Sequence, residues 1–265
     1  MYPTLEIFGF FIYTFGTILA FSWLLFIVLL HRFAWKKGFT KSIFGSIVPF
    51  TLSIFFFGRL FYILSEWVDQ KFILIDLLHG NIIDSVKLFF IPEEYFFSLF
   101  GGIFGFMLVF LWKTRTIKKD RVRYLDSIIF AFLYSAILGY FGTLLGGQVY
   151  GIPFNSPISI VYNHSNTIIK DHIPLFPISV LYMILCAVLA ITLRKMSKKI
   201  LLPDGFIGFM GMGVFSIFIF LGEFLSGSRE DMFYDTFYLS LNQIGAIIGI
   251  VISILGLINL SSKSK

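Results

Sequence analysis

The chain has 265 residues, of which 57% are hydrophobic and 14% are charged, and its mean hydropathy is +0.88. A water-soluble domain cannot bury that much apolar surface, so the composition excludes a soluble globular protein and predicts one that crosses a membrane several times. The formal net charge of +6 falls mostly in short segments between apolar runs, which argues against a nucleic-acid-binding surface. The single cysteine, Cys186, excludes a disulfide framework and a cysteine-rich metal site.

Seven apolar stretches are long enough, or nearly so, to cross about 30 Å of hydrocarbon. We expect each to form a transmembrane helix of an all-α protein, and we interpret the first as a span because no basic segment precedes it, as one would in a signal peptide. Because no internal repeat or low-complexity linker interrupts the series, residues 1–265 are predicted to form a single integral membrane domain. The predicted spans are 7–31, 43–64, 95–113, 125–147, 174–195, 204–225 and 238–260.

Lysine and arginine are distributed unevenly between the predicted loops. Sixteen of the 21 fall in alternate loops and in the C-terminal tail, at 31–41, 113–123, 194–199 and 263–265. The loops on the other side hold Lys71, Lys87, Lys170 and Arg229. Because cytoplasmic loops carry the excess of positive charge, we predict an outside N-terminus and a cytoplasmic C-terminus.

Two segments on the predicted outer side are longer than simple connectors. Residues 72–91 are largely apolar but contain Asp76, Asp84 and Lys87, and placing such charges in a span costs roughly 2.5–3.5 kcal/mol each. We therefore expect an interfacial or re-entrant helix pair there. Residues 148–173 are polar and are expected to form an external arm.

Two ionisable side chains fall inside predicted spans. Arg59 lies in the second span and Glu223 near the end of the sixth, both in the half of the membrane that the charge pattern places outside. A charge at that depth is costly unless it has a partner or a polar cavity. Arg59 is therefore predicted to hold an anionic head group, with Glu223 orienting that group or another polar one. The alternatives are a structural Arg–Glu pair and an arginine that extends to the interface.

The segment 138–151 contains five glycines in fourteen residues. Small residues four apart, as at Gly142 and Gly146 or at Gly147 and Gly151, allow helix backbones to approach closely. The functional alternative is that backbone N–H groups at broken helix ends bind phosphate oxygens. The spacing alone favours packing.

Other polar residues carry weaker signals. Asp126 begins the fourth predicted span, where capping of that helix is a sufficient explanation. His79, His164 and His172 fall in predicted outside loops and are candidate general bases, although solvated loop histidines are commoner. No metal-binding or nucleotide-binding motif occurs, so no metal and no cofactor are expected.

The ordered motifs resemble those of the prolipoprotein diacylglyceryl transferases, over nearly the whole chain and with the same seven-span arrangement. Residues 177–182 are similar to that family's Pro-Ser-Gln-Leu-Tyr-Glu motif with one residue inserted. The other matching positions are 58–62, 98–105, Asp126, 139–151, Glu223-Phe224 and Gln243.

This resemblance implies an enzyme of the bacterial plasma (inner) membrane that moves diacylglyceryl from phosphatidylglycerol to the lipobox cysteine of a prolipoprotein. The implied partners are a phospholipid and prolipoprotein signal peptides, and the implied site faces the outer leaflet. Such chemistry needs a base to form the thiolate and cations or amides to stabilise the leaving phosphate. The candidate catalytic residues are Glu223 and Arg229. The predicted head-group-binding residues are Arg59, Tyr62, Tyr140, Gly142, Thr143, Gly147 and Gln148.

Several positions depart from the family pattern. Phe100 stands where the family has histidine, and Tyr140 where it has arginine. Thr143 and Gly146 replace asparagines, and Gln148 replaces a glutamate. Losing a head-group arginine and a catalytic histidine is expected to remove several kcal/mol of transition-state stabilisation.

Three hypotheses therefore stand: a divergent transferase, a catalytically impaired relative that binds a lipid or a lipoprotein, and a small transporter with Arg59 and Glu223 in its path. A transporter predicts polar residues through the whole membrane depth, whereas this chain has them mainly in the predicted outer half.

Overall fold

The structure is a computed structural model that describes residues 4–7, 10–37, 47–65, 97–115, 121–163, 173–199, 202–227 and 238–263. The chain falls into two compact units, and each is described by itself. Unit 1 comprises residues 1–44, 117–228 and 246–265, and unit 2 comprises residues 45–116 and 229–245.

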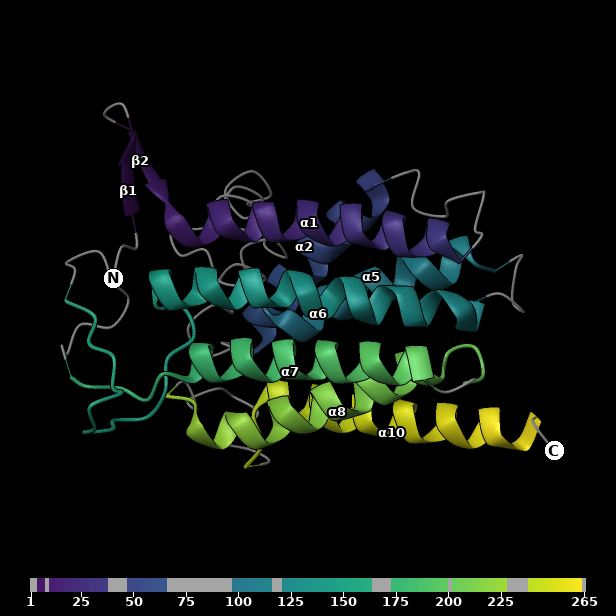
Figure 1. The fold of residues 1–265 in the computed structure, drawn as a ribbon. Helices are drawn as coiled ribbons and strands as arrows, with labels where there is room; N and C mark the ends of the chain where they lie inside the picture. The colour runs from purple at the N-terminus through teal and green to yellow at the C-terminus, as the bar shows by residue number, and fades with distance from the viewer. Residues whose placement is uncertain are drawn as a thin grey trace. The chain divides into compact units, whose positions relative to one another are not determined.

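Unit 1 is a layer of helices built around α6 (Arg121–Gly146). α1 (Thr14–Lys36), α7 (Ile178–Lys199) and α8 (Phe206–Gly222) all contact α6. Figure 1 shows α6 in teal between α1 in purple and α7 in green. α8 continues into the 3-10 helix η2 (Glu223–Leu225). α10 (Leu241–Lys263), whose residues from 246 onward belong to unit 1, packs on α8.

Contacts between small residues allow α8 and α10 to approach closely. A Cβ built on Gly249 would overlap Ser216 of α8, and one built on Gly213 would overlap Ser253 of α10. Ser253 Oγ donates a hydrogen bond of 2.5 Å to the carbonyl oxygen of Phe209. Helices in a membrane associate through such close packing and such hydrogen bonds.

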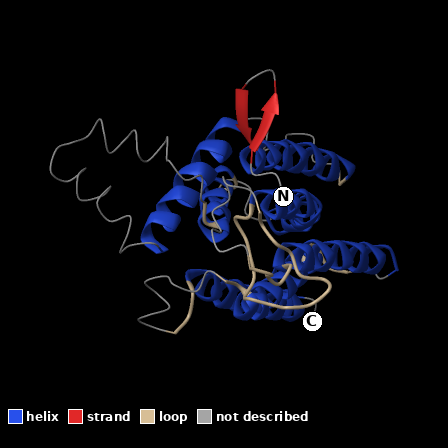
Figure 2. Ribbon diagram, turned by 90° about the vertical axis from the view of Figure 1, so that its left-hand side faces the viewer, coloured by secondary structure: helices blue, strands red, loops and turns tan. Residues whose placement is uncertain are grey.

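A short β-hairpin precedes α1, formed by β1 (Thr4–Ile7) and β2 (Phe10–Tyr13) with Thr4 paired to Tyr13. Figure 2 shows it in red beside the start of α1. The first predicted span, 7–31, was therefore placed too early, because the helix runs from Thr14 to Lys36. Within the part of the chain that the structure describes, the expectation of an all-α protein holds except for this hairpin.

Unit 2 contains α2 (Ile47–Ser65) and α5 (Leu99–Lys113), which pack closely against each other. A Cβ built on Gly101 would lie 2.7 Å from Cβ of Phe61, so the glycine face of α5 lies directly on α2. Ser53 Oγ donates a hydrogen bond of 2.8 Å to the carbonyl oxygen of Gly105 across this interface.

Six helices among the described residues are long and apolar enough to cross a membrane: α1, α2, α6, α7, α8 with η2, and α10. α5, predicted as a span over 95–113, has 15 helical residues, or roughly 22 Å at 1.5 Å per residue, which is less than the hydrocarbon thickness. Exposed apolar side chains such as Phe21, Leu24 and Val28 on α1 form a surface suited to lipid. The protein is therefore a multi-pass membrane protein.

Other predictions fall outside the described residues. They concern the helix pair over 72–91 and the outside histidines His79, His164 and His172. The orientation of the spans and the single-domain organisation stay predictions.

Candidate functional site

The polypeptide turns sharply where α6 ends. Gly147 follows the last helical residue with φ of 77°, a left-handed conformation that favours glycine, and its N–H donates to the carbonyl oxygen of Thr143 at 2.8 Å. The chain then crosses to η2, where Ile152 N–H donates to the carbonyl oxygen of Leu225 at 3.0 Å. This backbone pairing holds the 3-10 turn that carries Glu223 against the segment after α6.

A second set of hydrogen bonds joins this turn to α7. Thr143 Oγ1 lies 3.0 Å from Ser179 Oγ, and Ser179 Oγ donates to the carbonyl oxygen of Val149 at 2.8 Å. Thr143 and Ser179 are both buried. The Thr143 hydroxyl therefore has a structural role in joining α6 and α7, and its predicted contact with a lipid head group stays a prediction.

Two tyrosines and a glutamate meet within unit 1. The rings of Tyr140 on α6 and Tyr182 on α7 lie 5.0 Å apart between centroids, with 35° between their planes. Glu223 is 6% exposed and follows Gly222 directly at the end of α8. Gly222 makes room for this arrangement, because a Cβ built on it would lie 2.5 Å from Tyr182 Oη.

Tyr182 was not among the predicted site residues. The sequence signal that points to it is its place at the end of the 177–182 motif, which resembles a motif of the transferase family. Its side chain is 4% exposed, and its hydroxyl has no hydrogen-bond partner in the part of the chain that the structure describes.

Gln148 stands directly after the left-handed turn, and its side chain lies over Gly146. Its Oε1 atom is buried and accepts no hydrogen bond within the described ranges. A side chain added at position 146 would collide with this amide, so glycine there and glutamine at 148 fit together.

Gly142 faces α1. A Cβ built on it would lie 3.0 Å from Cβ of Ile18. About two turns earlier along α6, the carbonyl oxygen of Ser135 accepts a hydrogen bond of 2.7 Å from Ser22 Oγ of α1. These contacts agree with the packing interpretation of the glycines. A head-group role for Gly142 or Gly147 stays a prediction.

In unit 2, Arg59 is 4% exposed and its guanidinium carbon lies 5.2 Å from the centroid of the Tyr62 ring, one turn along α2. This distance permits a cation–π interaction. The preceding Gly58 accepts a hydrogen bond of 3.0 Å from the N–H of Ser98, which joins α2 to the start of α5.

Phe100 also lies in unit 2 and packs on Gly245 near the start of α10. A Cβ built on that glycine would lie 2.5 Å from Cγ of the Phe100 ring. A benzene ring that fills this space can act neither as an acid nor as a base.

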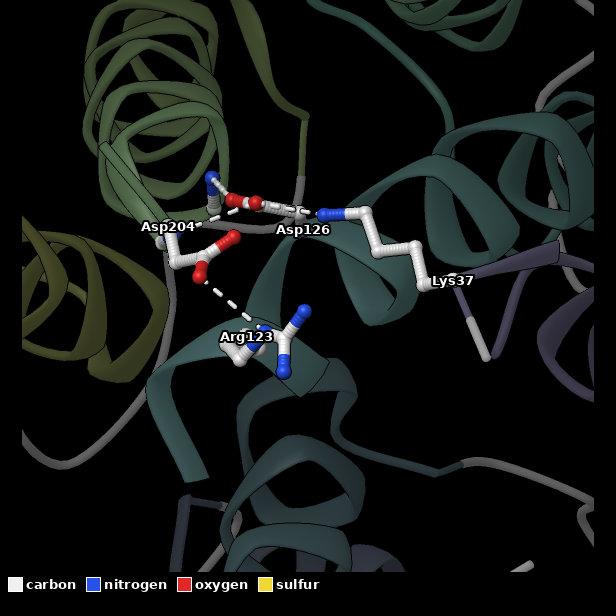
Figure 3. A network of polar contacts seen from close by, with 6 residues as sticks. Lys37, Arg123, Asp126 and Asp204 are labelled. Atoms are coloured by element: carbon white, nitrogen blue, oxygen red, sulfur yellow. Dashed lines mark hydrogen bonds and ion pairs between the residues drawn. The ribbon is translucent and has the colours of Figure 1, made fainter. Parts of the chain in front are cut away.

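At the other end of unit 1, Asp126 forms a polar network shown in Figure 3. It is 5% exposed, and its carboxylate accepts hydrogen bonds from the N–H groups of Gly205 at 3.1 Å and Gly208 at 2.8 Å. Lys37 Nζ donates to the same carboxylate at 2.7 Å. Asp126 was expected to cap its own helix. It lies instead within α6 and caps α8, whose free N–H groups and positive dipole end attract a carboxylate.

Arg229 and the three outside histidines lie outside the described residues. Arg59 belongs to unit 2 and Glu223 to unit 1. The prediction that both act on one head group therefore stays a prediction.

Comparisons with known proteins confirm the predicted resemblance. A family model described as prolipoprotein diacylglyceryl transferase matches residues 3–259. The chain is also 26% identical over 204 residues to a phosphatidylglycerol--prolipoprotein diacylglyceryl transferase of Clostridium tetani (strain Massachusetts / E88), a match that covers 75% of each chain.

Proposed function

The chain belongs to the prolipoprotein diacylglyceryl transferase family, and on this premise we propose that it transfers diacylglyceryl from phosphatidylglycerol to the lipobox cysteine of prolipoproteins. The family match over residues 3–259 is the observation that carries the proposal. It favours a transferase over a small transporter.

We further propose that the enzyme lies in the plasma membrane of a bacterium with its site toward the outer leaflet. The charges of unit 1 support this placement. Lys37 and Arg123 lie at the end of unit 1 that contains the Asp126 network. Arg194 lies near the C-terminal end of α7. Tyr182 and Glu223 lie near the opposite ends of α7 and α8. Because cytoplasmic ends carry the excess of Lys and Arg, the tyrosine–glutamate cluster falls toward the outer side.

In the proposed reaction, Glu223 accepts the thiol proton of the incoming cysteine. The resulting thiolate sulfur attacks the glyceryl carbon that bears the phosphate ester, so that a C–S bond forms and that C–O bond breaks. Glycerol phosphate leaves with the electron pair of the broken bond. Such a reaction also needs positive charge at the head group and at the leaving phosphate, and the sequence predicts Arg59 and Arg229 for this role.

Phe100 gives specific support to a second candidate function. Its ring packs on Gly245 at the position where the family has a histidine, so the site lacks that acid or base. A relative with this substitution, and with Tyr140 in place of arginine, would bind phospholipid and transfer slowly or not at all.

The two functions are separated by incubating the purified full-length protein with phosphatidylglycerol and a lipobox peptide. Transferase activity predicts a diacylglyceryl mass addition on the peptide cysteine, lost in Glu223→Gln. If the parent adds no mass while a C. tetani relative assayed alongside does, the transferase proposal is wrong. Binding of phosphatidylglycerol without transfer would then support the second function.

A further inference from the structure

The hydroxyl group of Tyr182 is one of several buried polar groups of unit 1 that have no hydrogen-bond partner among the described residues. Its side chain is 4% exposed. Among the described residues, no atom accepts a hydrogen bond from this hydroxyl or donates one to its oxygen. A buried hydroxyl without a partner destabilises the folded state, because it has given up its hydrogen bonds to water. Such a group calls for an explanation.

Packing holds this hydroxyl in one place. The Tyr182 ring lies against the Tyr140 ring at 5.0 Å between centroids, and its oxygen lies over the backbone of Gly222. Any side chain at position 222 would displace it, since even a Cβ there would be 2.5 Å from the oxygen. The donor is therefore positioned before any ligand arrives, beside the buried Glu223.

The missing partner must be a hydrogen-bond acceptor that enters an apolar layer of helices. A peptide substrate in the membrane offers a cysteine sulfur, which is a weak acceptor, and backbone carbonyl oxygens, which are paired within its own helix. A glycerolipid brings ester, hydroxyl and phosphate oxygens, all of which are strong acceptors, on apolar chains suited to this surrounding. The lipid is therefore the better match.

We infer that the Tyr182 hydroxyl donates a hydrogen bond to an oxygen atom of the glycerolipid substrate, with the Tyr140 hydroxyl as its neighbour. The inference rests on the proposed function, and it adds a neutral pair of phenol donors where the family pattern has an arginine. Tyr182 is then a substrate-binding residue whose hydroxyl is satisfied only in the lipid complex.

The test measures thermal unfolding and phosphatidylglycerol titrations on purified full-length protein in mixed micelles. Tyr182→Phe removes one oxygen atom and leaves the ring. We expect its unfolding temperature without added lipid to equal or exceed that of the parent, and its affinity for phosphatidylglycerol to fall about tenfold, as the loss of one hydrogen bond predicts.

Tyr162→Phe is the matched control, because the Tyr162 hydroxyl already donates to the carbonyl oxygen of Leu144 at 3.2 Å. This variant should unfold at a lower temperature and bind the lipid as the parent does. If Tyr182→Phe lowers the unfolding temperature as much as Tyr162→Phe does, the Tyr182 hydroxyl is structural and the inference is wrong. The inference is also wrong if the parent binds phosphatidylglycerol and Tyr182→Phe binds it with the same affinity. A parent that does not respond to phosphatidylglycerol contradicts the proposed function itself.

Discussion

At the scale of single residues, carboxylates that look alike in the sequence differ in their surroundings. Asp126 accepts two backbone N–H bonds and an ammonium bond while 5% exposed, whereas Asp204 pairs with Arg123 at 3.0 Å with its side chain 57% exposed. Burial determines how much each ion pair contributes to stability, because solvent screens the exposed Arg123–Asp204 pair more than the Lys37–Asp126 pair.

Asp126→Ala should destabilise the protein by about 2–4 kcal/mol, because it leaves the N–H groups of Gly205 and Gly208 and the ammonium of Lys37 without this acceptor. Asp204→Ala is the control and should cost no more than about 1 kcal/mol. Thermal or denaturant unfolding in detergent measures both. Equal losses in the two variants would show that Asp126 does not anchor α8.

Tyr162 gives a pH-dependent prediction. Its side chain is buried between the arm and the end of α6, and burial raises the pKa of Tyr162 to about 12. The unfolded chain loses this proton near pH 10, so the contribution of Tyr162 to stability is complete below pH 10 and is lost as the pH rises toward 12. Unfolding temperatures measured from pH 8 to pH 12 should fall less steeply above pH 10 in Tyr162→Phe than in the parent. Parallel curves would contradict this.

Residue chemistry was easier to predict than residue partners. The sequence indicated that Asp126 caps a helix, but the N–H groups it binds lie about 80 positions further along the chain. Tyr182 was missed for a related reason. A tyrosine in an apolar run has no distinguishing pattern until packing shows that its hydroxyl has no partner.

At the scale of helices, glycines determine how closely α2 and α5 approach. The α-hydrogens of Gly101 and Gly105 face the α2 backbone, and a Cβ on Gly105 would lie 2.8 Å from the carbonyl carbon of Ser53. A backbone atom cannot rotate away as a side chain can. The helices would have to separate and would lose the Ser53–Gly105 hydrogen bond.

Gly105→Ala should therefore lower the unfolding temperature by several degrees, while Gly16→Ala in α1 should leave it unchanged or raise it slightly. No atom lies within 4 Å of a Cβ built on Gly16, and alanine is favoured over glycine in a helix by about 1 kcal/mol. Differential scanning fluorimetry of the purified variants compares the two. A stable Gly105→Ala protein would contradict the close α2–α5 contact.

The hydropathy of the sequence predicted which segments form helices, but it did not predict the residues at which the helices begin and end. Residues 7–13 continue the apolar run of α1, so composition alone could not separate the β-hairpin from the span. α5 begins later than predicted, at Leu99, where Ser98 Oγ accepts a hydrogen bond from Gly101 N–H at 3.3 Å and caps the helix. Such local hydrogen bonds set boundaries that an average over 18 residues cannot detect.

At the scale of the whole molecule, the chain belongs to the transferase family, and the sequence predicts that several of its motif positions are substituted. Backbone hydrogen bonds join the segment after Gly147 to the 3-10 turn that carries Glu223. That Tyr140 and Gln148 replace charged residues of the family stays a prediction from the sequence. We propose that Glu223, Tyr140 and Tyr182 together still support transfer.

The most direct measurement is mass spectrometry of a prolipoprotein made in bacteria depleted of their own diacylglyceryl transferase and supplied with this chain. With the parent chain we expect a diacylglyceryl group in thioether linkage on the lipobox cysteine. With Glu223→Gln expressed at the same level we expect unmodified prolipoprotein. Unmodified prolipoprotein in cells whose membranes contain the folded parent would show that this chain is not a transferase.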